Sequence, residues 1–128
     1  MVIDTSAVLA VLLDEPERAA LIRTTRGAVL FAPASLPWEV GNALVALVRR
    51  RRLDLAEARR VWNGYEAIAL RLVEVDVRGA IELAVESGLY AYDGYMLALA
   101  KERGFPILTL DARLAAGARR AGLTVVEV

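Results

Sequence analysis

The chain has 128 residues, a length typical of one domain, and its sixteen acidic and sixteen basic side chains give a formal net charge of zero. It contains neither cysteine nor histidine, which excludes disulfides, thiolate nucleophiles, cysteine or histidine metal ligands and a histidine general base. Lys101 is the only lysine, which disfavours a lysine-centred mechanism. Acid–base or metal chemistry therefore has to use carboxylates, tyrosine or hydroxyl groups.

Hydrophobic residues make up 57% of the chain, enough for a substantial core. No run of about eighteen uncharged apolar residues is present, so we expect no transmembrane helix and no membrane partner. The opening Met1-Val2-Ile3-Asp4 lacks the basic region and long apolar stretch of a signal peptide, so we expect a cytoplasmic protein.

Short apolar runs alternate with helical patterns along the whole chain, without repeats, low-complexity tracts or linkers. In chain order, the expected elements are a strand at 2–4, helices at 7–13 and 16–26, a strand at 29–32, helices at 37–52 and 54–69, a strand at 72–75, helices at 78–87 and 92–103, a strand at 106–110, a helix at 112–121 and a strand at 124–128.

Strands that are almost continuously apolar and are separated by helices indicate a parallel sheet covered on both faces. We therefore expect one α/β domain over residues 1–128, with a central, mainly parallel sheet of four to five strands flanked by helices. In such open sheets, ligands bind beyond the carboxyl ends of the strands. Chemistry-bearing residues are to be sought at that edge.

Four acids stand at positions that suit this edge. Asp4 directly follows the first expected strand and Asp111 the fourth, while Asp93 and Glu39 lie at the starts of helices. Each has an ordinary structural interpretation as well, because acids favour helix N-termini, where they satisfy free backbone N–H groups and suit the helix dipole. Glu39 shares a face of a strongly apolar helix with Asn42, which indicates either partial burial of a carboxylate or an exposed polar strip. Position alone leaves cap and ligand both open.

Four segments, in this order, resemble the PIN domain ribonuclease family, and specifically its small VapC-type toxins. They are MVIDTSAVLAVLLDEPE at 1–17, PWEVGNALVALVRRRRL at 37–53, YDGYMLALAKERG at 92–104 and ILTLDARL at 107–114. Each motif is weak alone, but the ordered set spans nearly the whole chain.

The resemblance implies a PIN-like three-layer sandwich and RNA cleavage that depends on Mg²⁺, with Mn²⁺ as a possible substitute. It also implies an acidic cluster made of Asp4, Glu39, Asp93 and Asp111. Polar neighbours that match the family's supporting positions are Thr5, Ser6, Asn42 and Thr109. Two departures are small: Gly94 replaces a frequent alanine and is expected to loosen its helix start, and Arg51 replaces a frequent glycine in the basic run.

Clustered carboxylates repel one another, and a hard cation with oxygen ligands relieves that repulsion. We expect Asp4 and Asp93 to bind the ion directly and Asp111 to bind it through water or at a second ion. Glu39 is expected to orient or deprotonate the attacking water, so that RNA phosphodiester bonds are hydrolysed by metal-activated water.

Substrate contacts beyond this cluster are less defined. The arginine run 49–52 is a candidate phosphate contact, although a solvated helix end that suits the helix dipole is the favoured explanation. Trp38, Tyr92 and Tyr95 are candidate base-stacking residues, for which packing is the simpler explanation.

Three other functions are compatible with a chain of this length and fold class. A phospho-receiver domain is disfavoured, because Asp76 lacks the required acidic companions and Lys101 lies inside a helix. A PIN-like module that binds RNA or protein without cutting, and a processing nuclease that is not a toxin, both stay open. A toxin implies RNA as substrate, a small antitoxin as partner and, by the abundance of apolar helix positions, a homodimer.

Overall fold

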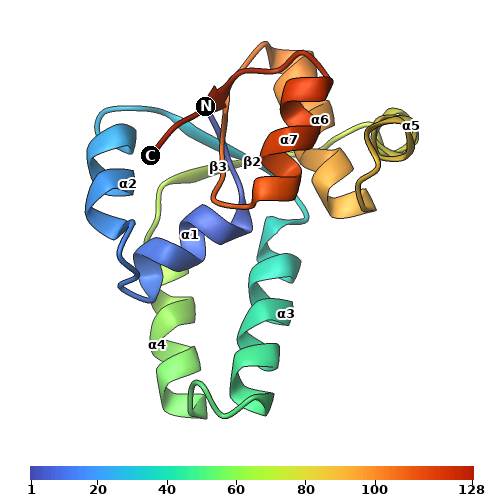
Figure 1. The fold of residues 1–128 in the computed structure, drawn as a ribbon. Coiled ribbons are helices and arrows are strands. Elements are labelled where there is room, and N and C mark those ends of the chain that lie inside the picture. The colour runs from blue at the N-terminus through green and yellow to red at the C-terminus, as the bar shows by residue number, and fades with distance from the viewer.

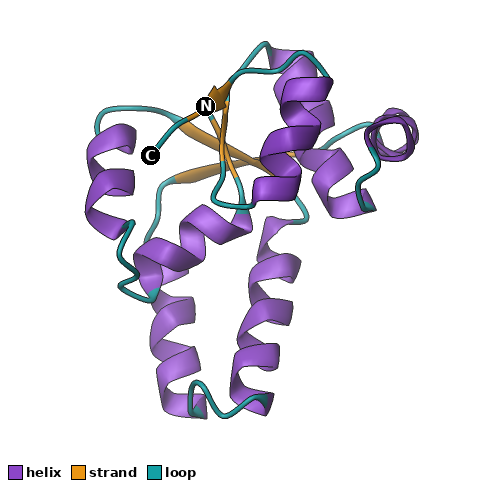
Figure 2. Cartoon of the chain, in the orientation of Figure 1, coloured by secondary structure: helices purple, strands orange, loops and turns teal.

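The computed structural model describes residues 1–128, which form one parallel five-stranded sheet with helices around it (Figure 1 and Figure 2). The spatial strand order is β3-β2-β1-β4-β5. The strands are β1 (Val2–Ile3), β2 (Leu30–Pro33), β3 (Leu70–Val73), β4 (Ile107–Leu108) and β5 (Val125–Val126). The helices are α1 (Thr5–Leu12), α2 (Arg18–Thr25), α3 (Leu36–Arg49), α4 (Leu55–Glu66), α5 (Val77–Ser87), α6 (Ala91–Arg103) and α7 (Ala112–Arg120).

The central strand β1 organises the sheet. Val2 pairs with Phe31 of β2 on one side and with Ile107 of β4 on the other. Val2 and Ile107 are fully buried, as expected for strands of a parallel sheet that is covered on both faces. The predicted α/β class and parallel sheet are confirmed.

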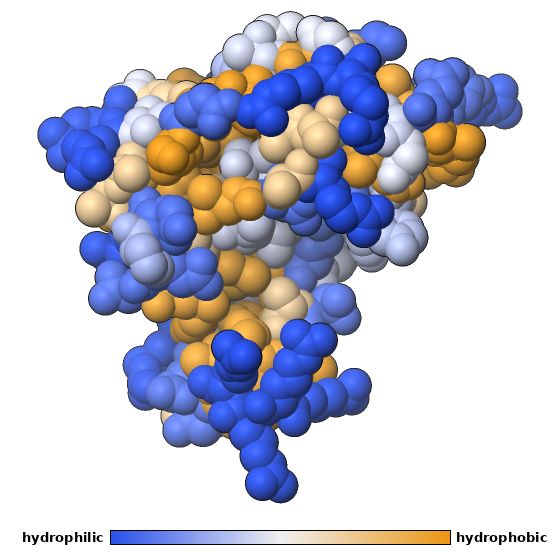
Figure 3. All heavy atoms as spheres, in the orientation of Figure 1, coloured by the Kyte–Doolittle hydropathy of each residue, from blue (hydrophilic) through white to orange (hydrophobic).

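The helices fall into two groups by their contacts. Helix α1 packs against α2, α3 and α4, while α5 packs against α6 and α7, and α6 lies on β1 and β2. Helices α3 and α4 form an antiparallel hairpin that projects away from the sheet, and hydrophilic surface gathers at its tip (Figure 1 and Figure 3). None of the helices combines the length and apolar character needed to span a bilayer.

Aspartates begin four of the helices. Asp54 and Glu57 form a complete capping box at the start of α4. Asp76 accepts hydrogen bonds from the first-turn amides of α5. Asp4 and Asp111 cap α1 and α7 in the same way. Capping therefore accounts for two acids of the predicted cluster without excluding a second role.

Several boundaries differ from the predicted ones. Helix α3 ends at Arg49 rather than at residue 52, because Arg51 adopts a left-handed conformation with φ of 56°. Glycine adopts this conformation without strain, whereas an arginine side chain disfavours it. Helix α4 ends at Glu66 rather than at residue 69, so β3 begins two residues earlier than predicted. Strand β4 ends at Leu108, so two residues separate it from Asp111.

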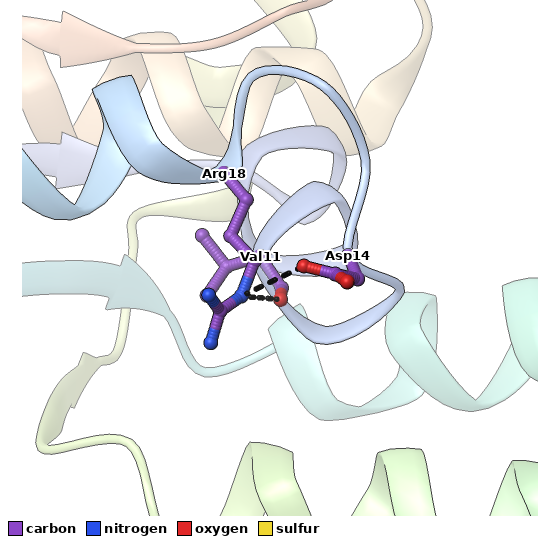
Figure 4. Close-up of polar contacts among 3 residues, drawn as sticks. All are labelled: Val11, Asp14 and Arg18. Carbon is purple, nitrogen blue, oxygen red and sulfur yellow. Dashed lines mark hydrogen bonds and ion pairs between the residues drawn. The ribbon is translucent and has the colours of Figure 1, made fainter.

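The turn between α1 and α2 is held by one arginine. Arg18 Nε donates to the carbonyl oxygen of Val11 at 3.2 Å and lies 3.4 Å from Asp14 Oδ1 (Figure 4). Asp14 itself has a positive φ of 58°. All three groups are at the surface, so this contact shapes the turn but contributes at most about 1 kcal/mol.

Helices α5 and α6 approach closely at Gly94. A Cβ placed there would lie 2.5 Å from the carbonyl oxygen of Ala80 and 2.8 Å from the Cβ of Ala84. The expectation that Gly94 loosens the start of α6 is therefore wrong. The missing side chain lets two helices pack in contact directly after Asp93.

Replacing Gly94 with alanine should destabilise the fold by about 1–3 kcal/mol, because the backbone of α5 has to move. The matched control is Gly41→Ala in α3, where nothing lies within 4 Å of the added Cβ and alanine should be neutral or mildly stabilising. Urea denaturation of both variants measures the difference. Equal stabilities of the two variants would show that α5 and α6 move apart at Gly94 without a measurable cost.

Candidate active site

The carboxylate of Asp4 lies at the centre of a buried polar network. It is only 5% exposed and accepts hydrogen bonds from Thr109 Oγ1 at 2.7 Å, from Ser6 Oγ at 2.8 Å and from the amide of Ala7 at 3.0 Å. Burial raises the pKa of Asp4, and these donors oppose that rise in part. A charged group this deep is stable only with such partners.

The same hydroxyls join the two strand ends that carry Asp4 and Asp111. Ser6 Oγ accepts from the amide of Leu110 at 2.9 Å, and Thr109 Oγ1 accepts from the amide of Asp111 at 2.9 Å. The segments after β1 and β4 are thus fixed to each other through Asp4. The predicted supporting residues Ser6 and Thr109 both take part in this network.

Glu39 lies in the first turn of α3 and is mostly withdrawn from solvent. Desolvation, together with the negative charges of Asp4 and Asp93, raises the pKa of Glu39 to about 7. The hydroxyls of Thr5 and Ser35 are close enough to favour its charged form, but neither meets hydrogen-bond geometry. Glu39 Oε2, Thr5 Oγ1 and Ser35 Oγ are consequently buried without partners. Buried polar atoms without hydrogen-bond partners are rare in proteins, so these three atoms suit a site that binds a polar ligand.

Asp93 lies in the first turn of α6 but does not cap the helix, whose preceding residue Tyr90 makes no side-chain cap either. Desolvation and the charge of Asp111 raise the pKa of Asp93, while Arg113 opposes the rise. The backbone of Tyr90 also lowers the pKa of Asp93, so this carboxylate is tied to its helix start less closely than Asp4 and Asp111, which accept hydrogen bonds from first-turn amides.

Asp111 is the exposed member of the group. Its Oδ1 accepts from the amides of Arg113 at 2.7 Å and Leu114 at 3.0 Å, which fixes the carboxylate at the start of α7. The charges of Asp4 and Asp93 both raise the pKa of Glu39, and the charge of Asp111 raises that of Asp93, so the four acids form a connected chain. The starts of α1, α3, α6 and α7 meet at this place near the centre of Figure 1.

The group fits a hard divalent cation with few direct protein ligands. No three acids stand in an arrangement that would by itself hold a metal ion. Mg²⁺ does not require that, because it keeps several waters and uses one or two carboxylates. All-oxygen donors, mutual repulsion and the unpartnered Oε2 of Glu39 favour such an ion here.

The remaining predicted residues lie outside the buried network around Asp4 and Glu39. Asn42, one turn beyond Glu39 on α3, is exposed and makes no side-chain hydrogen bond. The arginine run 49–52 is at the other end of α3, about 16 Å from Glu39 at 1.5 Å per residue. Trp38 is 69% exposed beside Glu39, whereas Tyr95 packs edge-on against Tyr92.

Two features of the site were not predicted from the sequence. Ser35, whose buried hydroxyl faces Glu39, precedes α3 and could have been found as the polar residue ahead of Pro37. A groove of about 310 Å³ runs from Ser6 along α1 and α3 to Glu15 and Arg50. Its floor is apolar, made by Leu9, Leu13, Ala43, Ala46, Leu47 and Leu110. Hydrophobic surface is exposed in this region (Figure 3).

Comparison with known proteins gives the family. The model of the PIN domain matches residues 1–120. This chain belongs to the PIN domain family. Ribonuclease VapC9 of Mycobacterium tuberculosis is 32% identical over 98% of both chains.

Solved structures support the same fold. A Pyrobaculum aerophilum protein, PAE2754, superposes with a TM-score of 0.70 and 24% identity over 91% of this chain and 84% of its own. Mycobacterium tuberculosis VapC20, described as a toxin that cleaves the sarcin-ricin loop, superposes with a TM-score of 0.68 and 15% identity over 99% and 98%. The three-layer PIN sandwich is thus confirmed.

Replacing Glu39 with glutamine should stabilise the metal-free protein at pH 8 by about 1–3 kcal/mol. The folded-state pKa of about 7 exceeds the ordinary 4.5, so the stability contributed by the neutral form is fully present below pH 4.5 and lost as the pH rises to about 7. The gain of the variant should therefore disappear at pH 4.5. Urea denaturation at both pH values in EDTA measures it.

The exposed Glu82 of α5 supplies the control, because Glu82→Gln removes one negative charge outside the site. A Glu39→Gln effect that is the same at both pH values, or that Glu82→Gln reproduces, would contradict the pKa assigned to Glu39.

Proposed function

We propose that this protein is a VapC-type toxin endoribonuclease that hydrolyses RNA phosphodiester bonds with a divalent cation, Mg²⁺ or in its place Mn²⁺. The observation that carries the proposal is the chain of four coupled acids, three of them with raised pKa values. The PIN fold and relatives named ribonuclease VapC support the nuclease and toxin roles.

Asp4 and Asp93 are proposed as direct ligands of the cation. Each carboxylate oxygen has two lone pairs, so Asp4 keeps acceptor capacity beside its hydrogen bonds, and Asp93 has only the backbone of Tyr90 as a hydrogen-bond donor. Asp111 is held rigidly by its helix and would act through a water molecule or at a second ion. When bound, the cation supplies positive charge that relieves the repulsion of the acids and polarises a phosphate oxygen.

Glu39 is proposed as the proton acceptor for the attacking water. A pKa of about 7 balances the charged and neutral forms near neutral pH, which suits a group that takes up and releases a proton. Its buried Oε2 is free of protein partners and can accept the hydrogen of that water. Thr5 and Ser35 lie beside this carboxylate and favour its charged form.

Two apolar surfaces of the protein are available for the partners that we propose for a toxin. The apolar groove between α1 and α3 reaches Ser6 and is the proposed docking site of a small antitoxin. Helix α5 exposes Val77, Ile81 and Val85 along one side, and we propose that this face contributes to a homodimer.

Purified protein should cleave single-stranded RNA in Mg²⁺, and EDTA should abolish the cleavage. Asp93→Asn should reduce the rate at least roughly a hundredfold because a charged ligand is lost, while the circular dichroism spectrum is unchanged. The same substitution should relieve the growth arrest expected when the chain is expressed alone in a bacterial host. RNA gel electrophoresis and growth curves measure the two effects.

Asp76→Asn is the matched control, since it changes a helix-capping aspartate outside the cluster and asparagine caps equally well. Equal cleavage by wild type and Asp93→Asn would refute the mechanism. Folded protein that binds RNA without cutting it would favour the binding-module alternative, and cleavage without growth arrest would favour a processing nuclease.

A further inference from the structure

Arg113 stands beside the carboxylate chain and is held by an aromatic ring. It lies in the first turn of α7, two residues after Asp111, and its guanidinium carbon is 5.0 Å from the centre of the Tyr90 ring. Tyr90 directly precedes α6 and is 72% exposed. The contact therefore bridges the starts of the two helices that carry Asp93 and Asp111.

The charge of Arg113 has no counterion in the protein. None of the three ion pairs involves it, and none of its guanidinium N–H groups donates a hydrogen bond. The residue is exposed, and its five guanidinium N–H donors are not bound to any protein acceptor. Stacking on Tyr90 restricts the orientation of these donors without using any of them.

The position of Arg113 is also unfavourable for helix stability. The start of a helix carries partial positive charge, which favours acids and disfavours cations there. The arginines that suit the dipole of α7 are at its other end, where Arg119 pairs with Glu127. Helix stability alone gives no reason for an arginine at residue 113.

Arg113 lies next to the acids, two residues after Asp111 and against the residue that precedes the helix of Asp93. Its positive charge lowers the pKa of Asp93, which desolvation and Asp111 raise. A strand whose phosphate approaches Asp93 would meet four acids and this one guanidinium. An unpaired, oriented guanidinium is the group that binds phosphate oxygens with two parallel hydrogen bonds.

We propose that Arg113, held against the ring of Tyr90, binds a phosphate of the RNA at the entrance to the carboxylate site and positions the strand for cleavage. Tyr90 acts as a positioning residue for the guanidinium. This inference rests on the nuclease function proposed above.

The direct test measures RNA binding apart from turnover. A fluorescein-labelled single-stranded RNA of mixed sequence is titrated with protein, with Ca²⁺ in place of Mg²⁺, and followed by anisotropy. Arg113→Ala should weaken binding roughly tenfold to a hundredfold, the range for a hydrogen bond to a charged group. The slope of log affinity against log salt should fall by about 0.7, the value for one phosphate contact on a single strand. Arg113→Lys should be intermediate, because it keeps the charge but not the fork.

The role of the ring is tested by variants of Tyr90. Tyr90→Phe keeps the aromatic face and should behave as wild type, whereas Tyr90→Leu should lose about twofold to fivefold in affinity. Combined with Arg113→Ala, Tyr90→Leu should cost nothing further, because the ring acts only through the guanidinium. In single-turnover cleavage with Mg²⁺, Arg113→Ala should raise the half-saturating protein concentration more than it lowers the maximal rate.

Arg23→Ala, which removes an exposed arginine of α2, is the charge-matched control. The proposal is overturned if Arg113→Ala binds RNA with the affinity and salt slope of Arg23→Ala and changes only the pH profile or the metal affinity. Arg113 would then serve Asp93 alone. Wild-type protein that neither binds nor cuts RNA would instead overturn the nuclease function itself.

Discussion

The buried Asp4 carboxylate is the constraint on which the site depends. It caps α1 through Ala7, accepts from Ser6 and Thr109, and through these two hydroxyls fixes the backbone after β4. One side chain therefore sets the distance between the segments that carry Asp4 and Asp111. Because a buried carboxylate without such donors would cost several kcal/mol, the polar residues around it are as necessary as the acid.

Around Asp4 the fold brings together carboxylates that repel one another. Glu39 and Asp93 arrive from α3 and α6 and have their pKa values raised by burial and by neighbouring acids. Asp93 directly precedes Gly94, where α5 and α6 approach each other closely. Such repulsion between acids lowers the stability of the folded protein, and the proposed cation would stabilise it by binding only the folded state. Arg113, held against the ring of Tyr90, places one positive charge beside these acids.

The sequence predicted most of the fold because the signals were local. Apolar strands between helices gave the parallel sheet, and Asp54 and Gly104 marked helix ends that the structure contains. The end of α3 was missed because Arg51 adopts a left-handed conformation despite its side chain. The packing role of Gly94 was missed because it depends on Ala80, which lies 14 residues earlier in the chain on another helix. For the site, strand ends indicated Asp4 and Asp111, and the family resemblance indicated Glu39 and Asp93. The helix pattern left the burial of Glu39 open, and tertiary packing decides it. The contact of Arg113 with the Tyr90 ring joins two helix starts far apart in the chain, so no local pattern encodes it.

The central claim is that the four acids form one electrostatic unit whose repulsion a divalent cation relieves. Its most direct test is the number of protons released when Mg²⁺ binds, measured by isothermal titration calorimetry at pH 7 in buffers of different ionisation enthalpy. Because Glu39 has a pKa of about 7, binding should release roughly half a proton per ion, and Glu39→Gln should remove most of that release. Binding of Mg²⁺ without proton release, or with the same release in Glu39→Gln, would contradict the account.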